Sequence, residues 1–278
     1  MKASLLSFAI YLASLGSGLL ALLYPFFLPG LSQSGTGGMR SAEMPVLMTL
    51  LLALCLLVLL YEVQGQAVYG SGRPAAVVIA LLGVLVAINS ALRFIETAVP
   101  GPGGFTPIFF LIILSGYVFG GRFGFLMGAL TMLVSALVTG GVGPWLPNQM
   151  FTAGWIGMSA ALLRLLIPRR AISQGSPPRL RQIVLLLAVF GFAWGFLYGG
   201  IMNLWEWPFI AGPQAQSWQP GQGVWSTLQH YAVFYLATSL VWDAVAAVGN
   251  LLIILAFGAP ALRALQRFQL RFSFQEGA

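Results

Sequence analysis

Charged residues are scarce in this sequence, because Asp, Glu, Lys and Arg make up only 7% of its 278 residues. A water-soluble domain contains about 25% of them, so the composition excludes that class. Hydrophobic residues reach 59%, and the mean hydropathy is +0.90. The apolar stretches are continuous rather than alternating, which excludes a transmembrane barrel. The sequence therefore predicts an all-α integral membrane protein.

The residue types on which catalysis and metal binding depend are also nearly absent. The chain has one cysteine (Cys55), one histidine (His230) and one lysine (Lys2). These counts exclude a disulfide within the chain, the histidine pair of an intramembrane metalloprotease, and a phosphate loop with its lysine. The six acidic residues are scattered, so they form no carboxylate cluster for Mg²⁺. We expect no catalytic residue, metal or cofactor, and any energy for transport must come from an ion gradient or a partner.

The apolar runs have the length of membrane-spanning helices. A run of about 20 apolar residues crosses the bilayer core, and the chain supplies about eight. They are residues 4–28, 44–61, 74–98, 105–119, 122–139, 150–167, 182–204 and 231–257. The first run resembles a secretory signal but is longer than the apolar part of one. The predicted organisation is an N-terminal two-helix membrane extension (1–73), a six-helix membrane core (74–258) and a basic cytoplasmic tail (259–278).

The basic residues predict how these helices are oriented. A net charge of +7 would suggest a nucleic-acid partner for a soluble protein, but in a membrane protein Lys and Arg mark the cytoplasmic loops. Residues 168–181 carry the strongest cluster: Arg169, Arg170, Arg179 and Arg181. With this loop inside, both termini are cytoplasmic, and the outer loops 98–105, 140–149 and 205–229 contain no Lys or Arg. Arg40, close to Glu43, is the exception. We expect a multi-pass plasma-membrane protein without a nucleic-acid partner.

The outer loops collect aromatic and amide side chains. The stretch from Gly140 to Trp155 is a Gly-Pro-Trp turn that enters a helix at Asn148 and Gln149, which predicts one wall of a pocket. An apolar pocket with a few oriented polar groups is suited to a small organic solute. An aromatic belt at the headgroup level is the alternative interpretation of the tryptophans. The candidate substrate-binding residues are Asn89, Arg93, Trp145, Asn148, Gln149, Asn203, Trp205, Glu206, Trp207, His230 and Asp243.

Some of these candidates have an equally good structural interpretation. Arg93 and Glu96 are three residues apart, so they can neutralise each other on one helix face. His230 lies at the predicted outer boundary of the last helix, where a solvated interface residue is the simpler interpretation.

The helix predicted at 74–98 has two different faces. At about 100° per residue, Gly83, Ala87 and Ala91 fall on one stripe that has almost no side chains. Small residues let helices approach closely in a membrane, so this stripe is the predicted partner-docking surface. Asn89 and Arg93 project from the opposite side.

Four stretches give the chain a resemblance to a known family. They are AINSALR (87–93), GRFGFLMGAL (121–130), GGVGPWLPNQMFTAGWIG (140–157) and MNLWEWP (202–208). They resemble the substrate-binding S components of energy-coupling factor (ECF) vitamin transporters, over about residues 74–271. The resemblance implies a six-helix protein without a motor, which binds a vitamin or related micronutrient on the outer face. Its implied partners are a membrane scaffold subunit and two ATPase subunits.

The resemblance also assigns roles to individual positions. Ala87 and Ala91 match the docking motif of the family, which Gly83 extends, and Trp145, Asn148 and Gln149 match its substrate-side loop. The helices before residue 74 have no counterpart in the six-helix pattern. The nearest resemblance is to members that carry cobalamin-like compounds, and the many outer tryptophans favour a large, flat or amphipathic solute.

Two other functions stay open from the residues alone. A stand-alone secondary transporter would couple to protons through Asp243, which is predicted about midway along 231–257. An ionised carboxylate is costly there, and Ser239 and Asn250 share its helix face, so a polar helix seam and a ligand site are both compatible. A membrane enzyme is the weaker alternative, since no catalytic constellation is visible.

Overall fold

The computed structural model describes residues 2–27, 43–69, 75–98, 105–167, 177–210 and 212–273. Within these ranges the chain is helical and has no strand. Four of the helices contain an apolar window long enough to cross a membrane, and three shorter apolar helices accompany them in the same ranges. The prediction of an all-α membrane protein is confirmed. The elements are α1 (Lys2–Phe27), α2 (Glu43–Tyr69), α3 (Ala75–Ala98), α4 (Ile108–Phe119), α5 (Gly121–Thr139), α6 (Leu146–Ala160), η2 (Ala161–Leu165), α8 (Pro177–Glu206), η3 (Trp207–Phe209), η4 (Gln214–Gln216), α9 (Val224–Thr238) and α10 (Leu240–Ser273).

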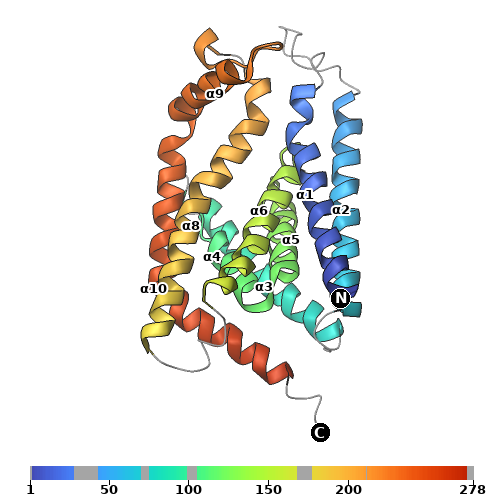
Figure 1. Cartoon of the computed structure of the whole chain (residues 1–278), viewed down its shortest axis with the longest axis vertical. Helices are drawn as coiled ribbons and strands as arrows, with labels where there is room; N and C mark the ends of the chain where they lie inside the picture. Colours follow the sequence, from blue (N-terminus) through green and yellow to red (C-terminus); the bar gives the residue numbers. More distant parts are fainter. Residues whose placement is uncertain are drawn as a thin grey trace.

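The helices form a bundle with two flanks and a centre. The α1–α2 pair lies along one flank, α8 and α10 lie along the other, and α4, α5 and α6 lie between them (Figure 1). The start of α1 and the end of α10 lie toward the lower end of this view, and the junction of α8 with α9 lies at the upper end. The two ends of the described chain therefore lie on the same side of the bundle, as the predicted even number of crossings requires. The upper end corresponds to the predicted outer face. Arg169 and Arg170, on which that topology depends, lie outside the described residues.

Glycine residues allow very close packing at the centre of the bundle. A Cβ atom added at Gly116 of α4 or at Gly124 of α5 would overlap the backbone of Gly157 on α6. One added at Gly128 would overlap the backbone of Ala153. Helices that approach this closely gain van der Waals contact along their backbones. The centre of the bundle is therefore a tightly packed apolar core.

The turn between α5 and α6 begins and ends at residues suited to those positions. Gly140 ends α5 with φ 70° and ψ 16°, a left-handed conformation that glycine adopts without steric cost. Helix α6 begins at Leu146, earlier than the predicted start at 150. Pro147 explains the difference, because proline fits the first turn of a helix, where its missing N–H has no partner to lose.

The last predicted span differs most from the structure. Residues 231–257 were predicted as one helix, but α9 ends at Thr238 and α10 begins at Leu240 and continues to Ser273. Ser239 interrupts the helix with φ −122° and ψ −30°. Asp243 therefore lies in the first turn of α10, and the prediction that it lies midway along a span is wrong. A carboxylate is favourable in a first turn, because the N-terminal end of a helix carries partial positive charge.

The N-terminal pair packs against the core. Helices α1 and α2 contact each other, and between them they contact α3, α5, α6 and α8. Gly18 makes the closest approach, since a Cβ atom there would overlap the indole of Trp155. On α2, the Cys55 thiol lies 3.8 Å from the Met150 sulfur. The predicted two-helix extension is thus a packed flank of the bundle.

Candidate functional site

The turn before α6 is held in one conformation by its own hydrogen bonds. The N–H of Leu146 donates to the carbonyl of Gly143 (3.0 Å), and the indole Nε1 of Trp145 donates to the carbonyl of Gly141 (3.2 Å). The indole folds over Gly143, where a Cβ atom would overlap the ring. The Gly-Pro-Trp turn is therefore closed by its tryptophan, which is 40% exposed.

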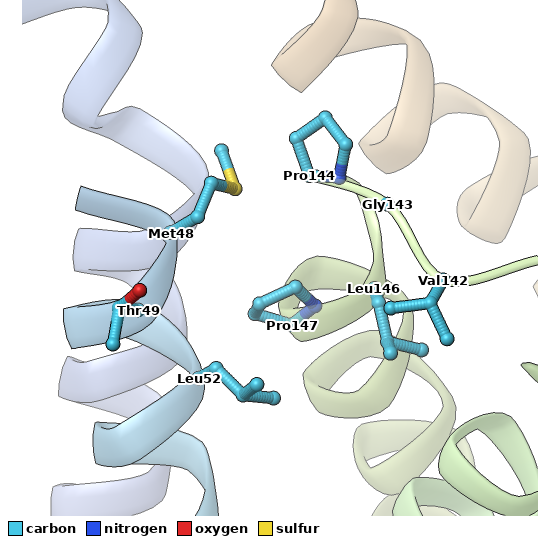
Figure 2. Close-up of a pocket in the computed structure, with 8 residues that line it drawn as sticks. All are labelled: Met48, Thr49, Leu52, Val142, Gly143, Pro144, Leu146 and Pro147. Carbon is cyan, nitrogen blue, oxygen red and sulfur yellow. The ribbon is translucent and has the colours of Figure 1, made fainter. Parts of the chain in front are cut away.

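A cavity of about 230 Å³ lies between this turn and α2. Figure 2 shows α2 on one side of the cavity and the turn with the start of α6 on the other. Nearly all the side chains around it are apolar, so it is suited to a hydrocarbon group. Its lining residues are Met48, Thr49, Leu52, Val142, Gly143, Pro144, Leu146 and Pro147.

The two predicted amides follow the cavity in the first turn of α6. Asn148 is 2% exposed, and neither its Oδ1 nor its Nδ2 has a hydrogen-bond partner among the described residues. Gln149 is half-buried. A buried amide without partners costs about 1–3 kcal/mol. Asn148 is thus a group whose hydrogen-bonding capacity is available to a ligand.

An aromatic cluster lies at the end of α8, where Trp205 and Trp207 are both buried. The Trp207 ring lies 5.3 Å from the ring of Tyr231 and 6.3 Å from that of Phe234. Its Nε1 donates to the carbonyl of Gln216 (2.6 Å), which ties η3 to the following segment.

The polar candidates around this cluster have different surroundings. Glu206 is exposed. The His230 Nδ1 lies 3.1 Å from the carbonyl oxygen of Ser217, so the imidazole organises the loop before α9. Asn203 donates from Nδ2 to the hydroxyl of Thr238 (3.4 Å), which links α8 to α9. In the part of the chain that the structure describes, no cluster of His, Cys, Asp and Glu could hold a metal.

The α3 candidates have their partners within the core. Asn89 donates to the carbonyl of Ile108 (3.1 Å) and to the hydroxyl of Thr131 (3.2 Å). The Arg93 guanidinium lies 2.7 Å from the sulfur of Met132. These contacts are with α4 and α5, so the structure does not group Asn89 and Arg93 with the α8 tryptophans.

The small-residue stripe lies on another face of α3. Gly83, Ala87 and Ala91 are all exposed, and nothing lies within 4 Å of a Cβ atom built on Gly83. Helix α3 is therefore bound to the core on one side and free on the other within the described structure.

Comparison with protein families adds a decisive observation. The model of the family "ECF transporter, substrate-specific component" matches residues 77–263. The chain belongs to this family. The resemblance predicted from the four sequence stretches is confirmed, and ECF module components and a small-molecule substrate are its implied partners. No curated protein and no solved structure matches the chain.

The extent of the match divides this ECF component into two parts. Every predicted site residue, from Gly83 to Asp243, lies within residues 77–263. Helices α1 and α2 lie before the match. The extension therefore has to be interpreted from its own contacts.

Asp243 of the ECF component belongs to a seam between α8 and α10. Its carboxylate accepts hydrogen bonds from Tyr235 and Ser239. Side-chain atom Oδ2 has no hydrogen-bond partner among the described residues, and the side chain is 8% exposed. On the facing helix, a Cβ atom at Gly199 would overlap the carboxylate. The close approach of the two helices thus encloses the Asp243 side chain.

Sequence reasoning missed the glycines that make this seam. Gly191, Gly195 and Gly199 follow one another at intervals of four along α8 and meet α10 at Ile254, Ala247 and Asp243. The G-x-x-x-G spacing in FGFAWGFLYGG was the available signal. The α1 residues that contact the outer tryptophans were also missed, and no local signal identifies them.

Proposed function

We propose that this ECF substrate-specific component binds a vitamin or related micronutrient on its outer face and delivers it by docking to a scaffold subunit coupled to two ATPases. Outer loops with buried tryptophans and an unpaired amide suit recognition of an organic solute. For the substrate itself, a cobalamin-like compound is the proposed candidate, and this choice rests on the sequence resemblance.

The division of α3 into two faces carries the docking part of the proposal. Asn89 is buried, whereas Ala87 and Ala91, two residues before and after it and therefore on the opposite side of the helix, are exposed. A smooth stripe of small residues lets a partner helix approach the backbone closely, which is how helices associate in the absence of a hydrophobic driving force. Large side chains on this stripe would hold the partner away.

The test is to replace Ala87 and Ala91 together by leucine. We expect uptake by cells that also produce the ECF module to be lost, while the purified variant still binds the solute. Ala193→Leu is the matched control, because Ala193 is also exposed but lies on α8. Loss of binding along with uptake would contradict the docking assignment.

The competing function is a stand-alone proton-coupled transporter that uses Asp243. The specific observation in its favour is the enclosed carboxylate, because a buried acidic group in a membrane is expected to be functional. Reconstitution of the purified chain in liposomes with an imposed proton gradient separates the two functions. Solute accumulation without any ATPase would favour the transporter, and its absence favours the ECF component.

A further inference from the structure

The N-terminal pair of helices covers the side of the core that carries the outer site. Gly18 of α1 packs against the rings of Phe151 and Trp155, and at the upper end of α1 Tyr24 interacts with Trp205. Phe26 is in contact with two further outer tryptophans, with ring centroids 6.3 Å from Trp207 and 5.6 Å from Trp218. Helix α1 thus joins the aromatic cluster of the family core, although it lies outside the family match.

Unsatisfied polar groups lie on the face of α6 that α1 approaches. Asn148 and Trp155 are seven residues apart, so they lie on one side of the helix. Gly18 identifies that side as the one facing α1, because it packs directly against Trp155. Trp155 is 8% exposed, and its Nε1, like both amide atoms of Asn148, has no hydrogen-bond partner within the described residues. Buried polar groups are nearly always hydrogen-bonded, so this set points to a ligand.

Helix α2, the second helix of the pair, lies across the apolar cavity from the start of α6. Met48, Thr49 and Leu52 of α2 face Leu146 and Pro147 across the apolar cavity (Figure 2). Leu146 and Pro147 immediately precede Asn148. One turn of α6 therefore has an apolar space on its α2 side and an unpaired amide close by, which is the combination that an amphipathic solute requires.

We propose that the α1–α2 pair is a wall of the substrate site and takes part in recognition. The solute offers a hydrogen-bond donor and acceptor to the Asn148 amide, and places a hydrocarbon portion between α2 and the turn at 142–147. This inference rests on the proposed function, since it concerns the same bound solute. A membrane lipid is the alternative occupant of the apolar cavity, and the binding experiments below distinguish it from a vitamin.

Two glycines on α1 provide the test. Gly18→Leu forces α1 away from Trp155, whereas Gly16→Leu is the matched control, because nothing lies within 4 Å of a Cβ atom at Gly16. Because α1 contacts α2, displacement of the pair is measured independently of binding through Cys55 of α2, the sole cysteine, which is 1% exposed. Maleimide should label Cys55 in folded Gly18→Leu protein and leave the wild type and Gly16→Leu unlabelled.

Binding is measured by native mass spectrometry after incubation with a mixture of water-soluble vitamins that includes cobalamin. We expect Gly18→Leu to bind the retained vitamin roughly tenfold more weakly or worse, as for loss of a packed contact surface. Gly16→Leu should bind as the wild type does. A labelled Cys55 with unchanged binding would overturn the inference and leave the proposed function intact. If the wild type bound no vitamin, both the inference and the proposed function would be contradicted.

A second variant covers the case in which Gly18→Leu does not fold. Leu52→Phe fills the apolar cavity from α2, and Leu57→Phe, on the exposed side of the same helix, is its control. We expect only Leu52→Phe to weaken vitamin binding, again by about tenfold. Equal binding by both variants, or displacement of a bound phospholipid alone, would overturn the inference.

Discussion

Two glycine-rich seams hold this bundle together, and they differ in what the glycines approach. In the central seam, Gly116 and Gly124 meet the backbone of Gly157, and the surrounding side chains are mainly apolar. In the α8–α10 seam, Gly195 also meets backbone, at Ala247, but Gly199 meets the carboxylate of Asp243, and Asn250 lies in the same interface with 0% exposure. Small residues thus allow close helix packing in both seams, and in the α8–α10 seam they also enclose polar side chains.

This difference between the seams predicts which substitutions each of them tolerates. Backbone atoms cannot move aside without shifting a whole helix, so added volume in the central seam has no local remedy. A carboxylate or amide side chain can rotate, and its cost depends on its hydrogen bonds rather than on volume alone. We expect the central seam to be sensitive to side-chain size, and the part of the α8–α10 seam around Gly199 to be sensitive to polarity.

The largest effect is expected from Gly124→Val. Its branched side chain would occupy the position of the Gly157 backbone, which should destabilise the folded protein by about 3 kcal/mol or more. Thermal unfolding in detergent, followed by size-exclusion chromatography, measures the loss. Gly83→Val is the control, because a Cβ atom there meets nothing within 4 Å. Similar unfolding temperatures for the two variants would contradict the central seam.

An intermediate effect is expected from Gly199→Ala. The new methyl group would displace the Asp243 carboxylate at a cost of about 1–3 kcal/mol. Gly200→Ala is the matched neighbour, because its methyl group would lie 3.8 Å from the ring of Tyr235, an ordinary contact. Unfolding temperatures of the single variants and of Gly199→Ala combined with Asp243→Ala give a double-mutant cycle. Additive effects would show that Gly199 and Asp243 are not coupled.

Much of the fold follows from composition and periodicity alone. The runs at 74–98 and 122–139 match α3 and α5 within one residue at each end, because continuous apolar length specifies a spanning helix. Helical geometry placed Gly83, Ala87 and Ala91 on one stripe, and all three are exposed in the structure. These features depend only on residues close together in the chain.

Features that depend on distant residues could not be predicted. The break at Ser239 lies within an apolar stretch, so hydropathy contains no sign of it, and the predicted position of Asp243 was wrong as a result. The contact of Gly18 with Trp155 joins residues far apart in the sequence. Asn89 and Asn148 look alike as outer amides, yet one has partners in the core and the other has none.

The smallest effect on stability is expected at two buried asparagines, where replacement by leucine should stabilise the protein in one case and destabilise it in the other. The Asn250 amide atoms have no hydrogen-bond partner among the described residues, so Asn250→Leu removes a desolvation cost and should stabilise the protein by about 1 kcal/mol. Asn89 donates to Ile108 and Thr131, so Asn89→Leu leaves acceptors unpaired and should destabilise by a similar amount. Unfolding temperatures of both variants measure the difference. Destabilisation by Asn250→Leu would show that its amide is hydrogen-bonded in the folded protein, and the α8–α10 seam would then be a satisfied polar contact rather than one with capacity left for a ligand.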